Sequence, residues 1–459
     1  MLTNFDTREI IKKLKQDSTE TKRFVDYKRY RELYRSEFAA PFASVLMKIR
    51  KRYPLQDTTA QSLVEINLFK ALTDFFKFLT TNNDFEIVTD KQEIWDKISE
   101  ENNFISVLKE VCIDNSRFGN GLFKLAFVDD KVKIFSVCPD CWFPVFNNGN
   151  LNDLAGHILI YDIEKDAKAY KHIEKIHKGY IENEVWMVSN GELSAQVENV
   201  RDFGLVEIDD FSDKWDDFVL FPVKNTSESD CYYGESDYKS CESIVEEIML
   251  TVSQNSKIIN RHANPKLAGS LENTQLNPVT GERYFPNSDF VKIGSDGQKP
   301  EYITADLQSE AIKAHINTLM QFFYILTKTP PQAYGVDLSG NMSGESLQKI
   351  FMSAVAKVED IRAVSLNNAI KKLVKCALAF SGAKDADVSV NWGNAIKLDY
   401  TEVVKTCNDR VLAGTQSKLS AIKQMDKATD EQAEEELKQI QEEQKADAAV
   451  PIEDVMIDD

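Results

Sequence analysis

The sequence predicts a helix-rich α+β protein, and two patterns along the chain support this fold class. Between Gly121 and Val197, short apolar segments are separated by Asp-Asp, Asn-Gly and Ser-Asn-Gly turns, which is typical of an antiparallel sheet. After Pro222, apolar residues recur at helical spacing over several long stretches. The 459 residues, 42% of them hydrophobic, are enough for roughly two to four packed regions.

Two helices are predicted before the strands. Residues 20–53 are rich in charge and carry aromatic residues at helix spacing, namely Phe24, Tyr27, Tyr30 and Tyr34. A second helix is expected over 59–81, where the apolar residues are Leu63, Ile66, Leu68, Leu72, Phe75, Phe76 and Leu79. The strands that follow are expected at GLFKLAFV, KVKIFSV, HILIYDI and EVWMVS.

Three long helices are predicted in the second half. The first covers 236–262, about 40 Å, and ends at Asn264-Pro265 because the residue before a proline avoids helical angles. A strand-and-turn stretch then leads to a helix over 306–326, about 32 Å long. The Pro- and Gly-rich loop TKTPPQAYGVDLSGNMSG precedes the longest helix, 344–381, of about 57 Å. Residues 400–445 are predicted to be helical again.

Charge is distributed unevenly between the two ends of the chain. The net charge of −19 argues against a protein that wraps DNA tightly, because neutralising phosphates needs clustered Lys and Arg. Residues 1–53 hold 14 Lys and Arg against 7 Asp and Glu, whereas residues 426–459 hold 3 against 13. Either both ends are solvated surface, or their opposite charges help neighbouring subunits find each other.

The sequence gives no sign of a membrane or secreted protein. No apolar run is long enough to cross a bilayer, and the N-terminus lacks the apolar centre of a signal peptide. We therefore expect no membrane contact and a protein that stays in the cytoplasm where it is made. The seven scattered cysteines are expected to be small buried hydrophobes rather than disulfides.

The motif Cys138-Pro139-Asp140-Cys141 is the strongest hint of an enzyme, since this spacing occurs in zinc sites and redox pairs. A zinc site needs two further ligands, and the nearest candidate is His157. A redox pair of the thioredoxin type opens a helix, but here Trp142 and Phe143 continue as extended chain. Two packed cysteines are the favoured interpretation, so we predict no catalytic residue, no metal site and no cofactor.

Five stretches between residues 218 and 440 follow one another in a distinctive order. The first contains Tyr-Gly-Glu-Ser-Asp-Tyr before the 236–262 helix and Asn-Pro after it, and the second is the 306–326 helix. The loop TPPQAYGVDLSGNMSGESL, the longest helix and the segment VNWGNAIKLDYTEVVKTCNDRV complete the series. In this order they resemble the portal protein family of tailed double-stranded DNA bacteriophages, in its siphophage branch.

The resemblance implies a portal fold with named parts. These are an α/β wing (1–235), a first stem helix (236–262), a small α/β clip (263–305), a second stem helix (306–326), a tunnel loop (327–343), a very long helix (344–381), a helical crown (382–445) and a disordered acidic tail (446–459).

The resemblance also implies a function. Portal proteins form a closed ring, here of about twelve subunits, at one vertex of the capsid. Double-stranded DNA passes through the channel without sequence-specific contact during packaging and ejection. The ring is the docking platform for the terminase large subunit and the head–tail adaptor, and it meets the scaffold and the major capsid protein. We therefore expect a structural virion protein, present in the host cytoplasm during assembly, and not an enzyme.

Candidate site residues follow from these parts. In the tunnel loop, the residues expected to face DNA, or else to pack the loop against its neighbour, are Tyr334, Val336, Asp337, Leu338, Ser339 and Asn341. In the clip, the core of an intersubunit sheet or a docking surface for adaptor and motor is expected at Tyr284, Phe285, Phe290 and Val291. The residues expected to pack the stem are Ile244, Ile248, Val252 and Ile259.

Two other classes of function stay open at this point. A cytoplasmic zinc- or thiol-dependent enzyme would be centred on Cys138 and Cys141 and would lose activity when either is replaced. A different phage virion protein or scaffold-like adaptor would also have long helices and an acidic tail, but it would form no closed ring.

Overall fold

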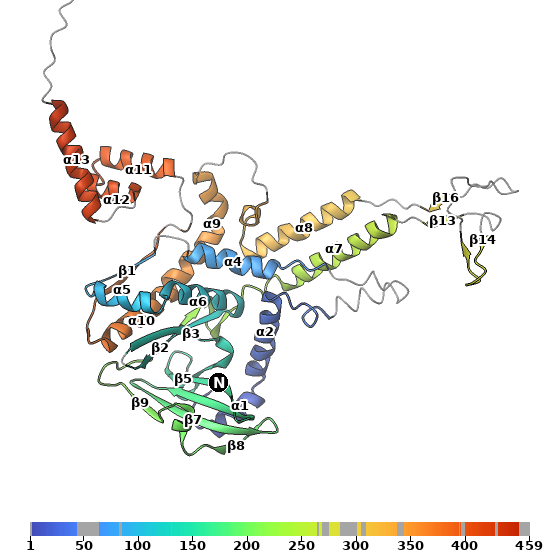
Figure 1. Cartoon of the computed structure of the whole chain (residues 1–459), viewed down its shortest axis with the longest axis horizontal. Helices are drawn as coiled ribbons and strands as arrows, with labels where there is room; N and C mark the ends of the chain where they lie inside the picture. The colour runs from blue at the N-terminus through green and yellow to red at the C-terminus, as the bar shows by residue number, and fades with distance from the viewer. Residues whose placement is uncertain are drawn as a thin grey trace, which may run out of the picture.

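The chain forms a mixed body of helices and sheets from which a pair of helices projects, as the computed structural model shows (Figure 1). The structure describes residues 2–43, 64–81, 85–129, 131–263, 266–268, 275–284, 301–303, 309–336, 344–393, 395, 400–426 and 430–448. The predicted helix-rich α+β class is confirmed. Among the described helices, none combines the length and the apolar character needed to span a bilayer.

The described helices of the first half are α1 (Thr7–Gln16), α2 (Ser18–Tyr34), α4 (Leu68–Thr81), α5 (Gln92–Glu101) and α6 (Phe104–Phe118). Helix α2 ends far short of residue 53, because Ser36 adopts a left-handed backbone with φ of 64°. The next helix, predicted over 59–81, is not continuous, because residues 64–67 are not helical and residues 59–63 lie outside the described residues. Helix α4 begins after Asn67, whose Oδ1 accepts a hydrogen bond from the backbone N–H of Lys70 at 2.8 Å.

The larger sheet is antiparallel and lies in the lower part of Figure 1. Its strands follow chain order: β4 (Trp142–Phe146), β5 (Leu154–Lys165), β6 (Lys168–Ile176), β7 (Tyr180–Ser189) and β8 (Glu192–Gln196), with β9 (Ile208–Asp210) also beside β7. Helix α1 covers one face of this sheet through Ile10, which packs with Phe143, Ile158 and Ile173. The N-terminal segment is thus part of the sheet's hydrophobic core.

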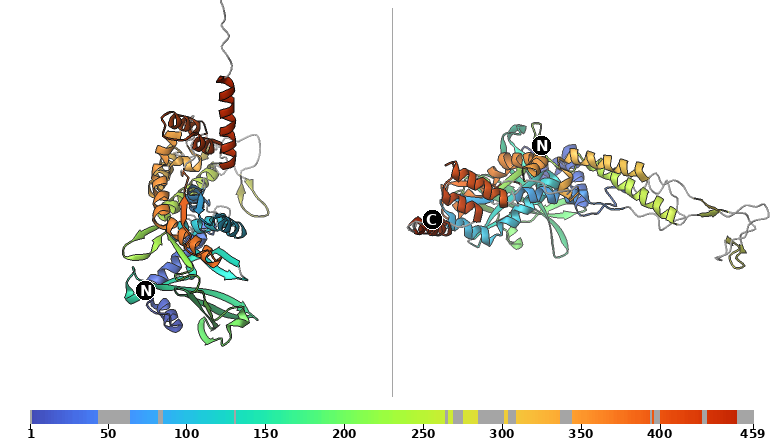
Figure 2. Two further views of the ribbon diagram at one scale, coloured as in Figure 1. Left: turned by 90° about the vertical axis from the view of Figure 1, so that its left-hand side faces the viewer. Right: turned by 90° about the horizontal axis from the view of Figure 1, so that it is seen from above.

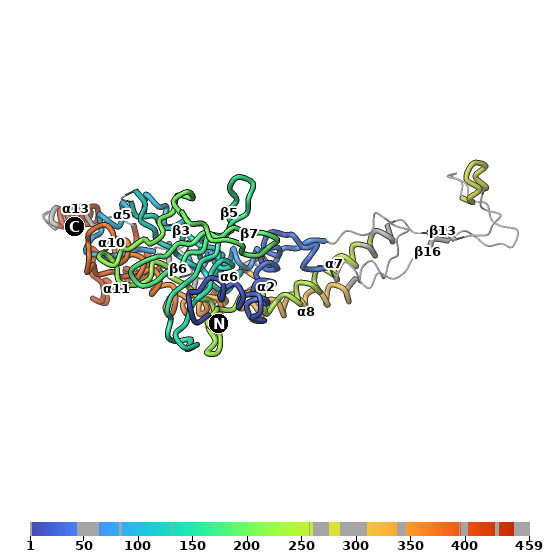
Figure 3. Tube along the Cα trace, turned by 90° about the horizontal axis from the view of Figure 1, so that it is seen from below, coloured from blue at the N-terminus to red at the C-terminus, as the bar shows by residue number. Residues whose placement is uncertain are grey.

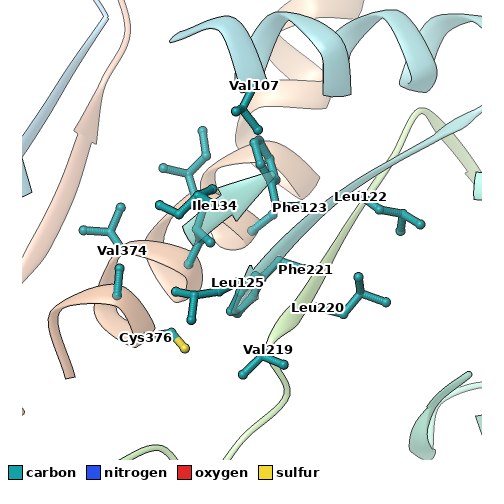
Figure 4. Close-up of a cluster of buried hydrophobic side chains, with 14 of the residues drawn as sticks. Val107, Leu122, Phe123, Leu125, Ile134, Val219, Leu220, Phe221, Val374 and Cys376 are labelled. Carbon is teal, nitrogen blue, oxygen red and sulfur yellow. The ribbon is translucent and has the colours of Figure 1, made fainter. Parts of the chain in front are cut away.

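A smaller antiparallel sheet forms the centre of the body. Its order is β10 (Leu220–Lys224), β2 (Asn120–Val128) and β3 (Lys131–Ser136). The central strand β2 is buried on both faces over its first six residues, and the buried Lys124 within it forms an ion pair with Glu174 of β6. Helix α6 covers one side, and α10 (Asn367–Phe380) brings Val374 and Cys376 against Leu125 and Phe221 (Figure 4).

The described helices of the second half are α7 (Glu242–Ala263), α8 (Ser309–Thr327), α9 (Gly344–Ile361), α10, α11 (Tyr400–Leu412), α12 (Lys418–Asp426) and α13 (Asp430–Ala448). Helices α9 and α10 are joined by a π-helical segment, Arg362–Leu366, so the predicted long helix runs continuously through a bulge. Helix α7 starts at Glu242 and not at residue 236. Residues 236–241 form a turn, because Asp237 N–H donates to Ser116 O at 3.0 Å and Ser236 Oγ donates to Arg117 O at 2.6 Å.

The remaining strands form short antiparallel pairs. They are β1 (Glu86–Thr89) with β17 (Val388–Asn391), β11 (Thr226–Glu228) with β12 (Cys231–Glu235), β13 (Lys266–Ala268) with β16 (Glu301–Ile303), and β14 (Gln275–Leu276) with β15 (Arg283–Tyr284). The β1–β17 pair places a strand inside the 382–445 stretch expected to be helical, because Val388 is buried and pairs with the N-terminal body. At the other end of that stretch, α13 continues to Ala448, past the predicted limit of 445.

Helices α7 and α8 lie side by side and leave the body together, and β13 and β16 continue in the same direction (Figures 2 and 3). The C-terminal helices α11, α12 and α13 lie at the opposite end of the molecule in the same views. The fold therefore has a central body with two extensions that leave it on different sides (Figure 1).

A close backbone contact between Gly119 and Gly234 gives the first prediction. Gly119 follows α6 with φ of +79°, and a Cβ there would lie 2.2 Å from Gly234 O. Gly191 has nearly the same φ, +77°, but open space around it. We expect Gly191→Ala to cost about 1–2 kcal/mol of backbone strain, and Gly119→Ala to cost about 1–3 kcal/mol more, because the chain must move to accommodate the methyl group. Urea unfolding of the two variants would measure this, and equal midpoints would contradict it.

Candidate functional site

The base of the projecting helix pair is held by a helical hydrophobic core. Val245, Ile248 and Met249 of α7 are buried in it, together with Leu319 and Phe323 of α8. Helices α2, α4 and α9 supply most of the rest of this core. Since its apolar residues come from both halves of the chain, the core fixes the direction in which the pair leaves the body.

The predicted stem residues fall into two groups. Ile248 is buried in the helical core, and Ile244 and Val252 pack against it, half-buried. Ile259 lies further along α7 and is exposed in the single chain. The structure thus brings three of the four together, and packing by Ile259 stays a prediction.

An apolar surface on α8 is an additional feature that the sequence analysis missed. Phe322, Ile325 and Leu326 are exposed, and the Ile325 side chain is 70% exposed. Their spacing of three and four residues puts them on one side of the helix, next to the side that carries the buried Phe323. The sequence shows these apolar residues in the run QFFYILT. A helix with apolar residues all round, however, gives no indication of which side packs against its own chain.

The segment after α8 folds back onto the helix. Lys328 adopts a left-handed backbone with φ of 56° and ends α8. The hydroxyls of Thr327 and Thr329 hydrogen-bond at 2.7 Å, and that of Thr329 lies 3.2 Å from the Tyr334 hydroxyl. A 3₁₀ turn, Pro331–Tyr334, follows and ends at Gly335. Polar and backbone contacts therefore hold the first part of the predicted tunnel loop.

Tyr334, one of the predicted DNA-facing residues, packs within its own chain. Its ring contacts Phe323, Tyr324 and Phe75, with ring centroids 5.9, 5.9 and 6.4 Å away. Burial raises the pKa of Tyr334, so its hydroxyl is neutral. Val336 is exposed two residues later. The other predicted loop residues, Asp337, Leu338, Ser339 and Asn341, lie outside the described residues, so contact of this loop with DNA stays a prediction.

The predicted clip residues are described only in part. Tyr284 lies in β15 opposite Gln275 of β14, is exposed, and donates a hydrogen bond to Gln275 Oε1 at 3.4 Å. Phe285, Phe290 and Val291 lie outside the described residues. Their role as a sheet core or a docking surface stays a prediction.

The carboxylate of Asp237 connects several elements at the base of α7. It forms an ion pair with Lys357 of α9 and accepts hydrogen bonds from Ser116 Oγ at 2.7 Å and Asn225 Nδ2 at 2.6 Å. The adjacent Tyr238 hydroxyl lies 2.7 Å from the Thr73 hydroxyl of α4. The motif Tyr-Gly-Glu-Ser-Asp-Tyr therefore links α4, α6 and α9 at one point, a role that the sequence analysis did not identify.

A second buried polar contact holds the long helix at its π-helical segment. Arg362 donates from Nη2 to the carbonyl oxygens of Leu79 and Thr80, at 3.1 and 3.0 Å, and so caps the end of α4. Its guanidinium also lies 4.8 Å from the ring centroid of Trp392. Burial lowers the pKa of Arg362, although a guanidinium keeps its charge in proteins. The π-helical segment thus carries a buried cation that joins two helices.

Comparison with known protein families gives a match over nearly the whole chain. The family model for "Phage portal protein, SPP1 Gp6-like" matches residues 12–449. This chain belongs to that portal family. The predicted portal identity is confirmed, and with it a place in the bacteriophage virion as a head–tail connector protein of a structural family.

Solved structures with similar chains come from gene transfer agent (GTA) particles. They are the neck of an empty GTA particle computed with C6 symmetry (11% identity, TM-score 0.45, 78% of this chain and 88% of that chain), the neck of a native GTA particle computed with C12 symmetry (10%, 0.42, 77% and 88%) and the virion of a native GTA particle (11%, 0.44, 83% and 97%). No curated protein matches the chain significantly in sequence.

The cysteine motif of this portal-family chain lies between α2 and the larger sheet. Cys141 Sγ donates to Cys138 O at 3.0 Å, and Arg31 pairs with Asp140. Burial raises the pKa of Cys138 to about 11 and that of Cys141 to about 12, so both thiols are neutral and poor nucleophiles. Among the described residues, no three His, Cys, Asp or Glu side chains are grouped to bind a metal.

The buried ion pair at the base of α7 gives a second prediction. The side chains of Asp237 and Lys357 are 5% and 14% exposed, so Lys357→Met leaves a buried carboxylate without its cation. We expect a loss of about 3–5 kcal/mol in unfolding free energy. The control is Lys372→Met, which breaks a pair with Asp217 whose side chains are 61% and 30% exposed; it is expected to cost at most about 1 kcal/mol. Denaturant unfolding measures both, and equal losses would exclude a special role for Asp237.

His157 gives a third prediction, on pH. Its Nδ1 accepts a hydrogen bond from Trp142 Nε1 at 3.0 Å, and burial lowers its pKa to about 3. In the unfolded chain a histidine titrates near 6.5, so below that pH the unfolded state binds a proton that the folded state does not. Stability should therefore fall from pH ~6.5 towards ~3, with a contribution of up to about 1.4 kcal/mol per pH unit. In His157→Asn the slope should be shallower by this amount, and parallel profiles of unfolding free energy against pH would contradict it.

Proposed function

We propose that this chain forms a closed ring of about twelve subunits at one capsid vertex, and that the ring's channel is the path of the genome during packaging and ejection. The main support is the family match over residues 12–449, in a chain where two paired helices, a Pro/Gly loop and a long helix follow in order. In this proposal, α7 and α8 form the stem, residues 263–305 the clip and 327–343 the tunnel loop.

Ring closure requires two different complementary faces on each subunit, because the contacts of a cyclic assembly are head-to-tail. The exposed face of α8, with Phe322, Ile325 and Leu326, is one candidate for such a face. The basic N-terminal region and the acidic C-terminal region supply charges of opposite sign. Both features fit a subunit that buries further surface against two neighbours.

Contact with DNA is proposed to be weak and independent of base sequence. The chain has a net charge of −19. Clustered lysines would bind the DNA tightly through counterion release, so a negatively charged protein favours a channel wall along which the DNA can slide. The residues proposed to approach the duplex are in the loop after the Tyr334 anchor, from Val336 to Asn341. Contact there would use shape and backbone groups rather than base edges.

The other partners are proposed from the position of each part. The clip, at the far end of the α7–α8 pair, is proposed to dock the terminase large subunit and the head–tail adaptor. Residues 1–235 and part of the long helix 344–381 would form the wing, which would meet the scaffold and the major capsid protein. Helices α11, α12 and α13 belong to the crown, which would face the capsid interior. Assembly would take place in the host cytoplasm before the ring enters the virion.

Electron microscopy of the purified full-length protein tests the proposed ring. We expect top views of closed rings with a central channel wide enough for duplex DNA. Ile325→Glu puts a charge on the exposed face of α8 and should prevent ring closure without lowering the unfolding midpoint. The control, Asn317→Asp, adds a negative charge at an exposed position of α8 on the side of the helix away from Phe322 and Leu326, and it should leave the rings intact.

The decisive negative result is specific. If the wild-type protein stays monomeric or dimeric at high concentration and after addition of scaffold protein, the ring proposal is wrong. If the Ile325→Glu variant forms rings as readily as the wild type, the ring proposal stands, but the exposed face of α8 is not part of the contact between subunits.

A further inference from the structure

A small cavity of about 20 Å³ lies beside the π-helical segment of the long helix. Ile361 and Leu366, at the two ends of that segment, form part of its wall. The rest of the wall comes from α4, α6, the end of β10 and the turn before α7. Five parts of the fold therefore meet around a space that no side chain fills.

Two polar atoms of residues on the cavity wall have no hydrogen-bond partner. They are Nδ2 of Asn115 and Oδ1 of Asn225, and the two residues are only 5% and 7% exposed. The orientation of the Asn225 amide is determined, because its Nδ2 donates to Glu235 O at 3.0 Å and to Asp237 Oδ1 at 2.6 Å. An unpaired donor and an unpaired acceptor thus belong to two residues that line the same cavity, and folded proteins rarely leave such buried groups unsatisfied.

We infer that this cavity holds one structural water molecule, which accepts a hydrogen bond from Asn115 and donates one to Asn225. Its volume is sufficient for a single water, which needs at least about 10–15 Å³ and two to four polar partners. A metal cation fits less well, because the Asn115 N–H group would point its positive end at the ion. The one carboxylate on the wall, Asp237, is already paired with Lys357.

The water gives the π-helical segment a different environment from the rest of the long helix. Elsewhere α10 is held by close-packed apolar side chains such as Leu373 and Val374. At the bulge, Leu366 would instead border a molecule that can exchange with solvent. The water would also extend the hydrogen-bond network of Asp237 to Asn115. The water site does not depend on the proposed ring or on any DNA contact. The inference of a bound water can therefore be wrong while the ring proposal is right, and the ring proposal can be wrong while the water is present.

The test is a structure of the full-length protein at a resolution that shows ordered water. We expect one peak within hydrogen-bond distance of both Asn115 Nδ2 and Asn225 Oδ1. In Asn115→Leu, which removes the donor, the peak should be absent. The control is Asn368→Leu, since Asn368 is exposed and donates only within its own helix, to Val364 O; the peak should stay there.

Two results would overturn the inference. An empty cavity in the wild-type map would do so without any variant, so the test stands even if Asn115→Leu fails to fold. A strong anomalous peak at the same place after soaking in rubidium chloride would show that a monovalent cation, and not water, occupies the site.

Discussion

The buried carboxylate of Asp237 is the constraint on which the arrangement of the other elements depends. A charge with so little exposure is stable only when its partners are in place, and these come from α6, from the chain after β10 and from α9. Its ion pair with Lys357 joins the start of α7 to the long helix, so the two cannot move apart without leaving a charge unpaired. The close approach of Gly119 and Gly234 brings the backbone near enough for these contacts to form.

From this point the molecule extends in two directions. Helices α7 and α8 share a hydrophobic core at their base and leave the body together, while Arg362 joins the long helix to the end of α4. A subunit of a closed ring needs a stiff connection of this kind, because each face must reach its neighbour at a fixed angle. The aromatic contacts of Tyr334 add a second fixed point, from which the proposed tunnel loop starts.

Much of the fold could be predicted because helical and strand periodicity are local properties. The apolar stripes of α8 and of the long helix and the turn-separated strands β2, β3, β5 and β7 were found in this way. Element ends were predicted less well, since they depend on contacts from distant residues. Helix α7 starts late because Ser236 and Asp237 bond to the end of α6, and β17 forms because a strand more than 290 positions earlier offers its edge.

The sequence by itself determined the fold class, the order of helices, strands and loops in the second half, and the portal family, because these depend on residue types and spacing along the chain. Only the tertiary structure decided which polar residues meet. Asp237, Asn225, Ser116 and Lys357 are scattered over more than 240 positions, and nothing in their local surroundings distinguishes them from surface residues. Burial gives them their importance, since a polar group without water must find its partner within the protein, and burial exists only after the chain has folded.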